Sequence, residues 1–209
     1  NNSLLFSEGP VYRMDILKSL GFENPPETAE EFYEVLVAIK NAGVVEIPFS
    51  IRAEHINRML APAFDSWDTW YVEDGQVKHG YLDDNRYDYL AFVNKLYTEG
   101  LLDNDYMSVN KNGMNSMFLS GRVAVAYNPG SLIGNAVATM PDAEISSAKP
   151  LSSVKGQNSK FAKMNTVFDT GAASAAAITT SCKNIEAAAR LLDYAYGEEG
   201  HLLANFGIE

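Results

Sequence analysis

Hydrophobic residues in the first quarter of the chain recur at helical spacing and predict a capped, half-buried helix. Thr28 and Glu31 have the spacing of a capping box, in which a hydroxyl and a carboxylate bond the unpaired amides of a helix end. The apolar positions that follow lie at i, i+3, i+4 and i+7, and they are Phe32, Val35, Leu36 and Ile39. Gly43 ends the pattern, and a shorter helix is expected earlier, from Val11 to Leu20.

Two short segments with turn residues around them predict β-structure. Residues 46–51 have the composition of a buried strand, in which Pro48 removes one backbone donor and therefore favours an edge position or an irregular end. Residues 70–78 alternate around Asp74 and Gly75, a pair that tolerates positive φ. This second segment predicts a β-hairpin.

Helices and strands alternate through most of the remaining chain. Helices are expected at 84–99, at 110–119, from Ser131 and after Asn184, and a strand is expected at 123–127. The helix at 84–99 is expected to bury one face, made of Leu90, Val93, Leu96 and Tyr97. Residues 152–160 are polar and predict an exposed loop. This alternation indicates a layered α/β domain rather than a helical bundle or a sandwich.

Charge and cysteine content exclude several classes of function. The chain has 16 Lys and Arg against 27 Asp and Glu, a net charge of -11, which would repel a phosphate backbone, so no nucleic-acid partner is expected. Cys182 is the only cysteine, so neither an internal disulfide nor a cysteine-rich zinc site is possible. The sequence has no apolar run of the roughly 20 residues that a membrane span needs and no signal-peptide pattern. Any targeting signal is expected outside this chain.

Familiar catalytic and metal-binding motifs are missing from the sequence. Neither Ser120 nor Ser174 lies in a nucleophile elbow, and the three histidines are not spaced as zinc ligands. Residues 103–105 begin like a calcium loop but lack its glycine and its distal glutamate. No glycine-rich phosphate cradle is present. We therefore predict no catalytic residue, no metal site and no cofactor.

Aromatic residues gather around two predicted turns, and they are Phe64, Trp67, Trp70, Tyr71 and Tyr127. Sugars offer apolar C–H faces and rings of hydroxyls, so their sites combine flat aromatic platforms with directional polar side chains. Packing on one face of the hairpin explains Trp70 and Tyr71 equally well. Trp67 lies just before the hairpin, between polar residues, and is expected to be exposed and functional.

Four segments, in order, carry a resemblance to a known family: VYRMDIL (11–17) with PETAEEF (26–32), YVEDGQV (71–77), MFLSGRVAV (117–125) and SCKNIEAA (181–188). Together they resemble the extracellular solute-binding proteins of sugar importers, a family that includes maltose-binding protein. The resemblance is closer to the lipoprotein branch of Gram-positive bacteria. It extends over nearly the whole chain.

This resemblance implies a three-layer α/β lobe of the class II periplasmic-binding-protein type. In the family, two such lobes are joined by crossing strands and close on a ligand. Residues 11–170 would form the C-terminal-type lobe. Residues 171–209 would supply a crossing strand, near 171–178, and helices that belong to the other lobe. The two-lobe architecture would therefore be incomplete in this chain.

The resemblance also implies a ligand site on two loops, one after each of two strands. The first loop carries Arg52, Glu54 and His55, and the second runs from Asn128 to Ser131. Relatives often place a sugar-stacking tryptophan near Ser131, and this chain has none there. The aromatic platform is therefore expected at Trp67, with Tyr127 second. The predicted ligand-binding residues are Arg52, Glu54, His55, Trp67, Tyr127, Asn128 and Ser131.

The expected function is non-enzymatic: the substrate-binding component of an ABC importer, binding an oligosaccharide or similar polar nutrient outside a bacterial cell. Its partners would be permease subunits, and a lipid anchor outside this chain would hold the monomeric protein to the membrane. A carbohydrate-active enzyme is one alternative, which requires two opposed carboxylates about 5–10 Å apart. A structural or adhesive surface domain is another, favoured if Trp67 and residues 52–55 are buried in packing instead of facing a common edge.

Overall fold

The computed structural model describes residues 8–129, 131–161, 176–194 and 196–207. These residues fall into two compact units, one within 1–165 and one within 166–209. The boundary predicted between residues 170 and 171 lies outside the described residues, as does most of the crossing strand expected at 171–178. Both remain predictions.

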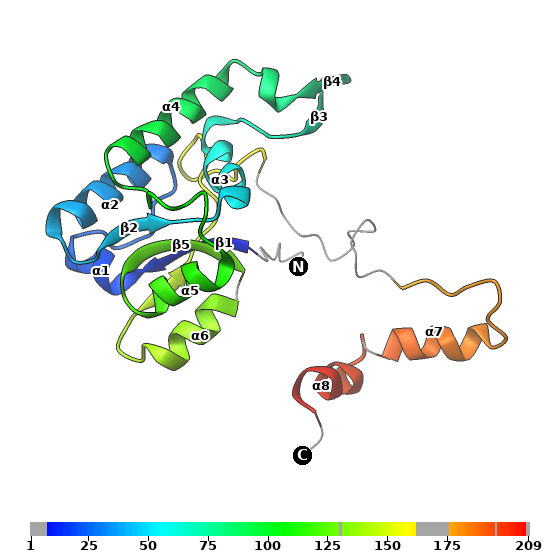
Figure 1. Ribbon diagram of the computed structural model, residues 1–209. Coiled ribbons are helices and arrows are strands. Elements are labelled where there is room, and N and C mark those ends of the chain that lie inside the picture. The colour runs from blue at the N-terminus through cyan, green and yellow to red at the C-terminus, as the bar shows by residue number, and fades with distance from the viewer. Residues whose placement is uncertain (1–7, 130, 162–175, 195, 208–209) are drawn as a thin grey trace. The chain divides into compact units, whose positions relative to one another are not determined.

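A four-stranded sheet forms the centre of the first unit, with strand order β2-β5-β1-β6 (Figure 1). Its strands are β1 (Glu8–Arg13), β2 (Ile47–Ser50), β5 (Val123–Pro129) and β6 (Ile145–Ser147). Strands β2 and β5 run parallel, with Phe49 opposite Val125, whereas β1 is antiparallel to both β5 and β6. Pro48 lies in an edge strand, as predicted, where its missing N–H is tolerated.

Helices cover both faces of this sheet (Figure 1). The helices are α1 (Met14–Ser19), α2 (Ala29–Ala42), α3 (Ala53–Leu60), α4 (Asn85–Thr98), α5 (Lys111–Leu119) and α6 (Ser131–Thr139). Tyr12 packs in one core cluster with side chains of α1 to α4, while its neighbour Val11 packs in another with α5 and α6. Adjacent strand residues point to opposite faces, so the predicted three-layer α/β fold is confirmed.

The start of α2 follows the predicted cap closely. Thr28 accepts a hydrogen bond from the Glu31 N–H at 3.3 Å, and the Glu31 carboxylate accepts one from the Glu27 N–H at 2.9 Å. The carboxylate therefore reaches one residue beyond the cap. The predicted apolar stripe is fully buried and ends at Gly43, which is the left-handed C-cap.

The polar segment from residue 151 to 161 is tied down on the first unit. Glu27 accepts hydrogen bonds from the Ser152 N–H at its carbonyl and from the Gly156 N–H at its carboxylate, both at 2.8 Å. Lys155 forms an ion pair with Glu31. Ser152 and Ser159 are buried, so the prediction of a wholly exposed loop is wrong at these positions. The segment links the start of α2 to the region around the hairpin.

The predicted hairpin is confirmed as β3 (Trp70–Glu73) and β4 (Gln76–His79). Asp74 has φ 52° and Gly75 has φ 74°, the two positive values that a type I′ turn requires. Short 3-10 helices flank the region, η1 (Ala61–Phe64) before it and η2 (Gly80–Leu82) after it. A Cβ at Gly80 would lie 2.2 Å from the carbonyl oxygen of Trp67, so only glycine permits this close approach.

One prediction at the start of the sheet was wrong, and one strand of the sheet was missed. Residues 11–13 belong to strand β1, and the helix expected at 11–20 begins only at Met14. The strand depends on tertiary contacts, because Val11 pairs with Ala126 of β5 on one side and with Ser147 of β6 on the other. Strand β6 was not predicted, since three residues carry too little pattern to recognise.

The buried face of α4 also differs from the prediction. Tyr89 and Leu96 are fully buried, whereas Leu90 and Tyr97 are 51% and 43% exposed. The helix therefore buries Tyr89 in place of Leu90, and Leu96 without Tyr97, so at both ends the buried residue is the one just before the exposed residue.

The second unit holds α7 (Ile185–Tyr194) and α8 (Glu198–Phe206). Asn184 caps α7 as predicted, since its Oδ1 accepts a hydrogen bond from the Ala187 N–H at 3.0 Å. None of the helices in the described ranges is long and apolar enough to cross a membrane.

The cap at Thr28 gives a stability prediction. Thr28→Ala removes the acceptor of the Glu31 N–H and should lower the free energy of unfolding by about 1 kcal/mol. Urea denaturation of the chain measures this loss. Thr98→Ala is the matched control, because that exposed hydroxyl only donates to carbonyls of its own helix, and it should change stability by less than about 0.5 kcal/mol. Equal losses for the two variants would contradict the capping role.

The close approach at Gly80 gives a second prediction. Gly80→Ala forces a methyl group against the backbone of Trp67 and should cost about 1–3 kcal/mol of stability, with a shift in tryptophan fluorescence. Gly134→Ala is the control, because a Cβ there meets nothing within 4 Å inside α6 and should be neutral or stabilising. A Gly80→Ala variant that matches wild type in urea denaturation would refute the packing described here.

Candidate functional site

The carboxyl ends of β2 and β5 lie at the same edge of the sheet, because the two strands are parallel. The chain leaves β2 at Ser50 and passes through Arg52 into α3, and it leaves β5 at Pro129 before α6 begins at Ser131. In α/β sheets this edge is where ligands are usually bound. The residues predicted on the two loops are therefore brought to one place, called the strand edge below. The prediction of loops is wrong for Glu54 and His55, which lie in α3, and for Asn128, which lies in β5.

Arg52 is the central polar side chain of the strand edge. Its Nη1 pairs with Glu54, and its Nη2 lies 3.0 Å from Nε2 of His55. A guanidinium only donates, so His55 Nε2 is the acceptor in this contact. The Arg52 side chain is 17% exposed and that of Glu54 is 63% exposed. The pair thus presents both a donor group and an acceptor group to solvent.

Behind this pair, His55 packs on Tyr127. The two rings meet edge to face, with centroids 5.4 Å apart and an interplanar angle of 83°, and both residues are buried. This ring contact positions the imidazole that accepts the hydrogen bond from Arg52. Asn128 lies in β5 opposite Gly9, and Ser131 is the first residue of α6, while the side chains of both lie outside the described part of the structure.

Trp67 lies beside the hairpin. Its ring stacks on Phe161 at 5.6 Å with an angle of 17°, and Phe161 also meets Tyr71 edge to face at 5.0 Å. Trp67 is half-buried, so it is less exposed than the sequence led us to expect. Among the predicted site residues, Arg52, His55 and Tyr127 therefore contact one another, whereas the described ring contact of Trp67 is with Phe161.

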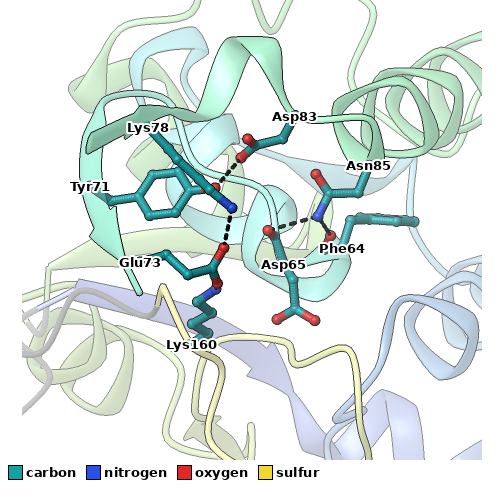
Figure 2. Close-up of polar contacts among 8 residues, drawn as sticks. All are labelled: Phe64, Asp65, Tyr71, Glu73, Lys78, Asp83, Asn85 and Lys160. Carbon is teal, nitrogen blue, oxygen red and sulfur yellow. Dashed lines mark hydrogen bonds and ion pairs between the residues drawn. The ribbon is translucent and has the colours of Figure 1, made fainter. Parts of the chain in front are cut away.

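A polar pocket of about 510 Å³ lies between the hairpin and the start of α4, called the hairpin pocket below (Figure 2). Its lining includes Tyr71, Glu73 and Lys78 from the hairpin, Asp83, Asp84 and Asn85 from the start of α4, and Lys160. Sequence reasoning missed this pocket. Lys160 is far away in sequence, and no local pattern indicates that it lies against the hairpin.

Glu73 is the electrostatic centre of the hairpin pocket. Lys78 donates to its carboxylate at 2.6 Å, and Lys160 forms a second ion pair with it. The hydrogen bonds from Lys160 and Lys78 lower the pKa of Glu73 to about 2, so the carboxylate stays ionised in acid where an ordinary glutamate would be protonated. The Tyr71 hydroxyl donates to Asp83 at 2.8 Å, and burial together with this carboxylate raises the Tyr71 pKa.

Asn85 closes one wall of the pocket (Figure 2). Its amide nitrogen donates to the carbonyl oxygens of Phe64 at 2.7 Å and Asp65 at 2.8 Å. Both donors are thus used, and Oδ1 is buried without a hydrogen-bond partner among the described residues. Buried acceptors usually have a partner, so this oxygen marks an incomplete polar network.

Metal binding finds no support in the described part of the chain, where no three His, Cys, Asp or Glu residues are grouped suitably. The strand edge and the hairpin pocket are both suited to hydrogen bonding with a polar ligand.

Comparison with known proteins agrees with the fold. The family model for bacterial extracellular solute-binding proteins matches residues 6–201. Lipoprotein LipO of Bacillus subtilis (strain 168) is 26% identical over 222 residues, covering 95% of this chain and 42% of LipO.

Two crystal structures share the fold. Alginate-binding protein AlgQ2 without calcium ion has a TM-score of 0.60 and 23% identity, covering 97% of this chain and 43% of AlgQ2. The binding protein MsmE of Bacillus subtilis subsp. subtilis str. 168, in an open conformation, has a TM-score of 0.53 and 16% identity, covering 73% of this chain and 41% of MsmE. The chain thus spans about two fifths of the length of these relatives. It belongs to the family of bacterial extracellular solute-binding proteins.

Proposed function

We propose that this chain forms part of the substrate-binding component of an ABC importer and binds an oligosaccharide or similar polar nutrient outside the cell. Membership of a family that is typically non-enzymatic supports this function. The observation that carries it is the meeting of Arg52, His55 and Tyr127 at the carboxyl edge of two parallel strands.

The chemistry of the strand edge suits a ligand rich in hydroxyl groups. Arg52 donates hydrogen bonds and Glu54 accepts them. A sugar hydroxyl does both, so two neighbouring hydroxyls of a sugar can accept from Arg52 and donate to Glu54. The buried ring pair of His55 and Tyr127 holds Arg52 in place before the ligand arrives. Such preorganisation lowers the entropy lost on binding.

Trp67, Asn128 and Ser131 complete the proposed ligand site. Trp67 is half-buried with one ring face toward Phe161, so only the part of the ring that stays exposed is open to the C–H face of a sugar. Asn128 and Ser131 are proposed from their backbone positions at the end of β5 and the start of α6.

The names of two relatives support the proposed location and ligand class. One of them is named as a lipoprotein and another as alginate-binding. We infer an extracellular, monomeric protein, held to the membrane by a lipid anchor outside this chain, that delivers its ligand to permease subunits.

One observation favours the alternative of a structural or adhesive domain, namely the burial of His55 and Tyr127 and the packing of Trp67. The exposure of Glu54 beside Arg52 favours binding instead. At the strand edge a carbohydrate-active enzyme is less supported than binding, because Glu54 is the only carboxylate among the seven predicted residues and hydrolysis needs two.

Substitution of Arg52 tests the proposed site. In a longer protein that contains this chain, Arg52→Ala removes a charged donor and should weaken oligosaccharide binding by about 1.5–3 kcal/mol. Isothermal titration calorimetry against a panel of plant and host oligosaccharides measures the affinity.

Arg122→Ala is the matched control for this experiment. Arg122 forms a bidentate pair with Glu46, but it precedes β5 and so lies at the opposite end of the strands. Its replacement should leave the affinity unchanged. The proposal fails if no oligosaccharide binds, or if the two arginine variants lose affinity equally.

A further inference from the structure

The hairpin turns its polar face toward the protein and its apolar face toward solvent. Trp70, Val72 and Val77 share one face, in the register that places Trp70 opposite His79 and Val72 opposite Val77, and they are 66%, 70% and 69% exposed. The other face lines the hairpin pocket. Antiparallel strands normally bury the apolar face, so packing alone does not explain this orientation. Departures of this kind are expected at functional sites.

Lysine ammonium groups supply donors to the hairpin pocket. Lys78 and Lys160 both bond to Glu73, which fixes where their ammonium groups lie (Figure 2). Each ammonium has three donors, and both side chains are nearly half exposed, so donors remain for a ligand. Tyr71 adds an aromatic ring, with Lys160 Nζ 5.6 Å from its centroid.

Acceptors come from the start of α4 on the other side of the pocket. Asp83 already accepts from Tyr71 but keeps further lone pairs, and Asp84 is exposed beside it. The Asn85 Oδ1 is itself buried, so the acceptors that a ligand can reach on this side are the two carboxylates. Donors and acceptors therefore stand on facing walls of one hollow.

Charge selects among the ligand classes that such a pocket could take. Four carboxylates, those of Asp65, Glu73, Asp83 and Asp84, and two lysines line it, so its formal charge is about -2 and an anion is repelled. Lys78 and Lys160 already occupy the cation positions at Glu73, so a cationic ligand finds no free partner at that carboxylate. A neutral molecule with several hydroxyls needs no ion partner of either sign, because each hydroxyl donates and accepts.

We propose that the hairpin pocket is a second carbohydrate site, which takes a neutral mono- or disaccharide independently of the strand edge. Its volume of about 510 Å³ falls within the range of small-molecule sites, about 300–1,000 Å³. Sugar hydroxyls bridge Lys78 and Lys160 on one wall and Asp83 and Asp84 on the other. This site goes beyond the proposed function, since nothing in it depends on Arg52.

Amide chemical shifts of the ¹⁵N-labelled 209-residue chain test this proposal. Glucose, galactose and mannose serve as neutral probes, with glucuronate and glucosamine as their charged counterparts. At least one neutral hexose should shift the amides of residues 71–78 and 83–85 in a saturable way, and glucuronate should not. Shifts confined to residues near Arg52 would overturn the second site while supporting the strand edge.

Two substitutions show whether the pocket itself binds the sugar. Lys78→Met keeps the side-chain length but removes the ammonium, and it should weaken hexose binding about tenfold. Asp84→Asn alters an exposed carboxylate with little risk to folding, and it should also weaken binding. Lys111→Met, at the start of α5, is the matched control and should have no effect.

The outer face of the hairpin provides the last control. Trp70→Ala removes the exposed ring from the face opposite the pocket and should leave hexose binding intact. The proposal is overturned if Trp70→Ala abolishes binding, if Lys78→Met binds as wild type does, if glucuronate or glucosamine binds more tightly than every neutral hexose, or if no hexose shifts the pocket amides.

Discussion

Parallel pairing of β2 with β5 is the constraint on which the first unit depends. Parallel neighbours cannot be joined by a tight turn, so the chain must leave the sheet after Ser50 and return at Val123. The crossover contains α3, the hairpin, α4 and α5, which supply helices to both faces of the sheet. It also brings the carboxyl ends of the two strands together, and with them Arg52 and Tyr127.

The segment from residue 151 to 161 ties together parts that the sheet does not join. It reaches the start of α2 through Lys155 and the hairpin through Lys160 and Phe161. Exposed ion pairs contribute about 0–1 kcal/mol each, whereas an aromatic pair adds about 0.5–1.5 kcal/mol beyond the area it buries. Phe161, which contacts both Trp67 and Tyr71, therefore contributes more to holding the hairpin in place than the ion pair of Lys160 with Glu73.

The features that sequence predicted well are those encoded by neighbouring residues. Thr28 with Glu31, and Asp74 with Gly75, each specify a backbone conformation within a few positions. Residues 11–13 were misread because their strand exists only through pairing with distant β5 and β6. Similarly, no local pattern indicates that Phe161 lies against Trp67 or that Lys160 lies against Glu73. The hairpin pocket could therefore not be predicted from the sequence. The strand-edge residues were located through family resemblance, and the parallel register explains why two segments far apart in the sequence meet there.

The central claim is that the edge shared by β2 and β5 grips the ligand. A crystal structure of a longer protein containing this chain, grown with an oligosaccharide that it binds, tests that claim most directly. The account predicts sugar hydroxyls within hydrogen-bonding distance of Arg52 and Glu54, with the His55–Tyr127 ring pair unchanged beneath them. An oligosaccharide bound elsewhere, with Arg52 and Glu54 still facing only each other and solvent, would contradict it.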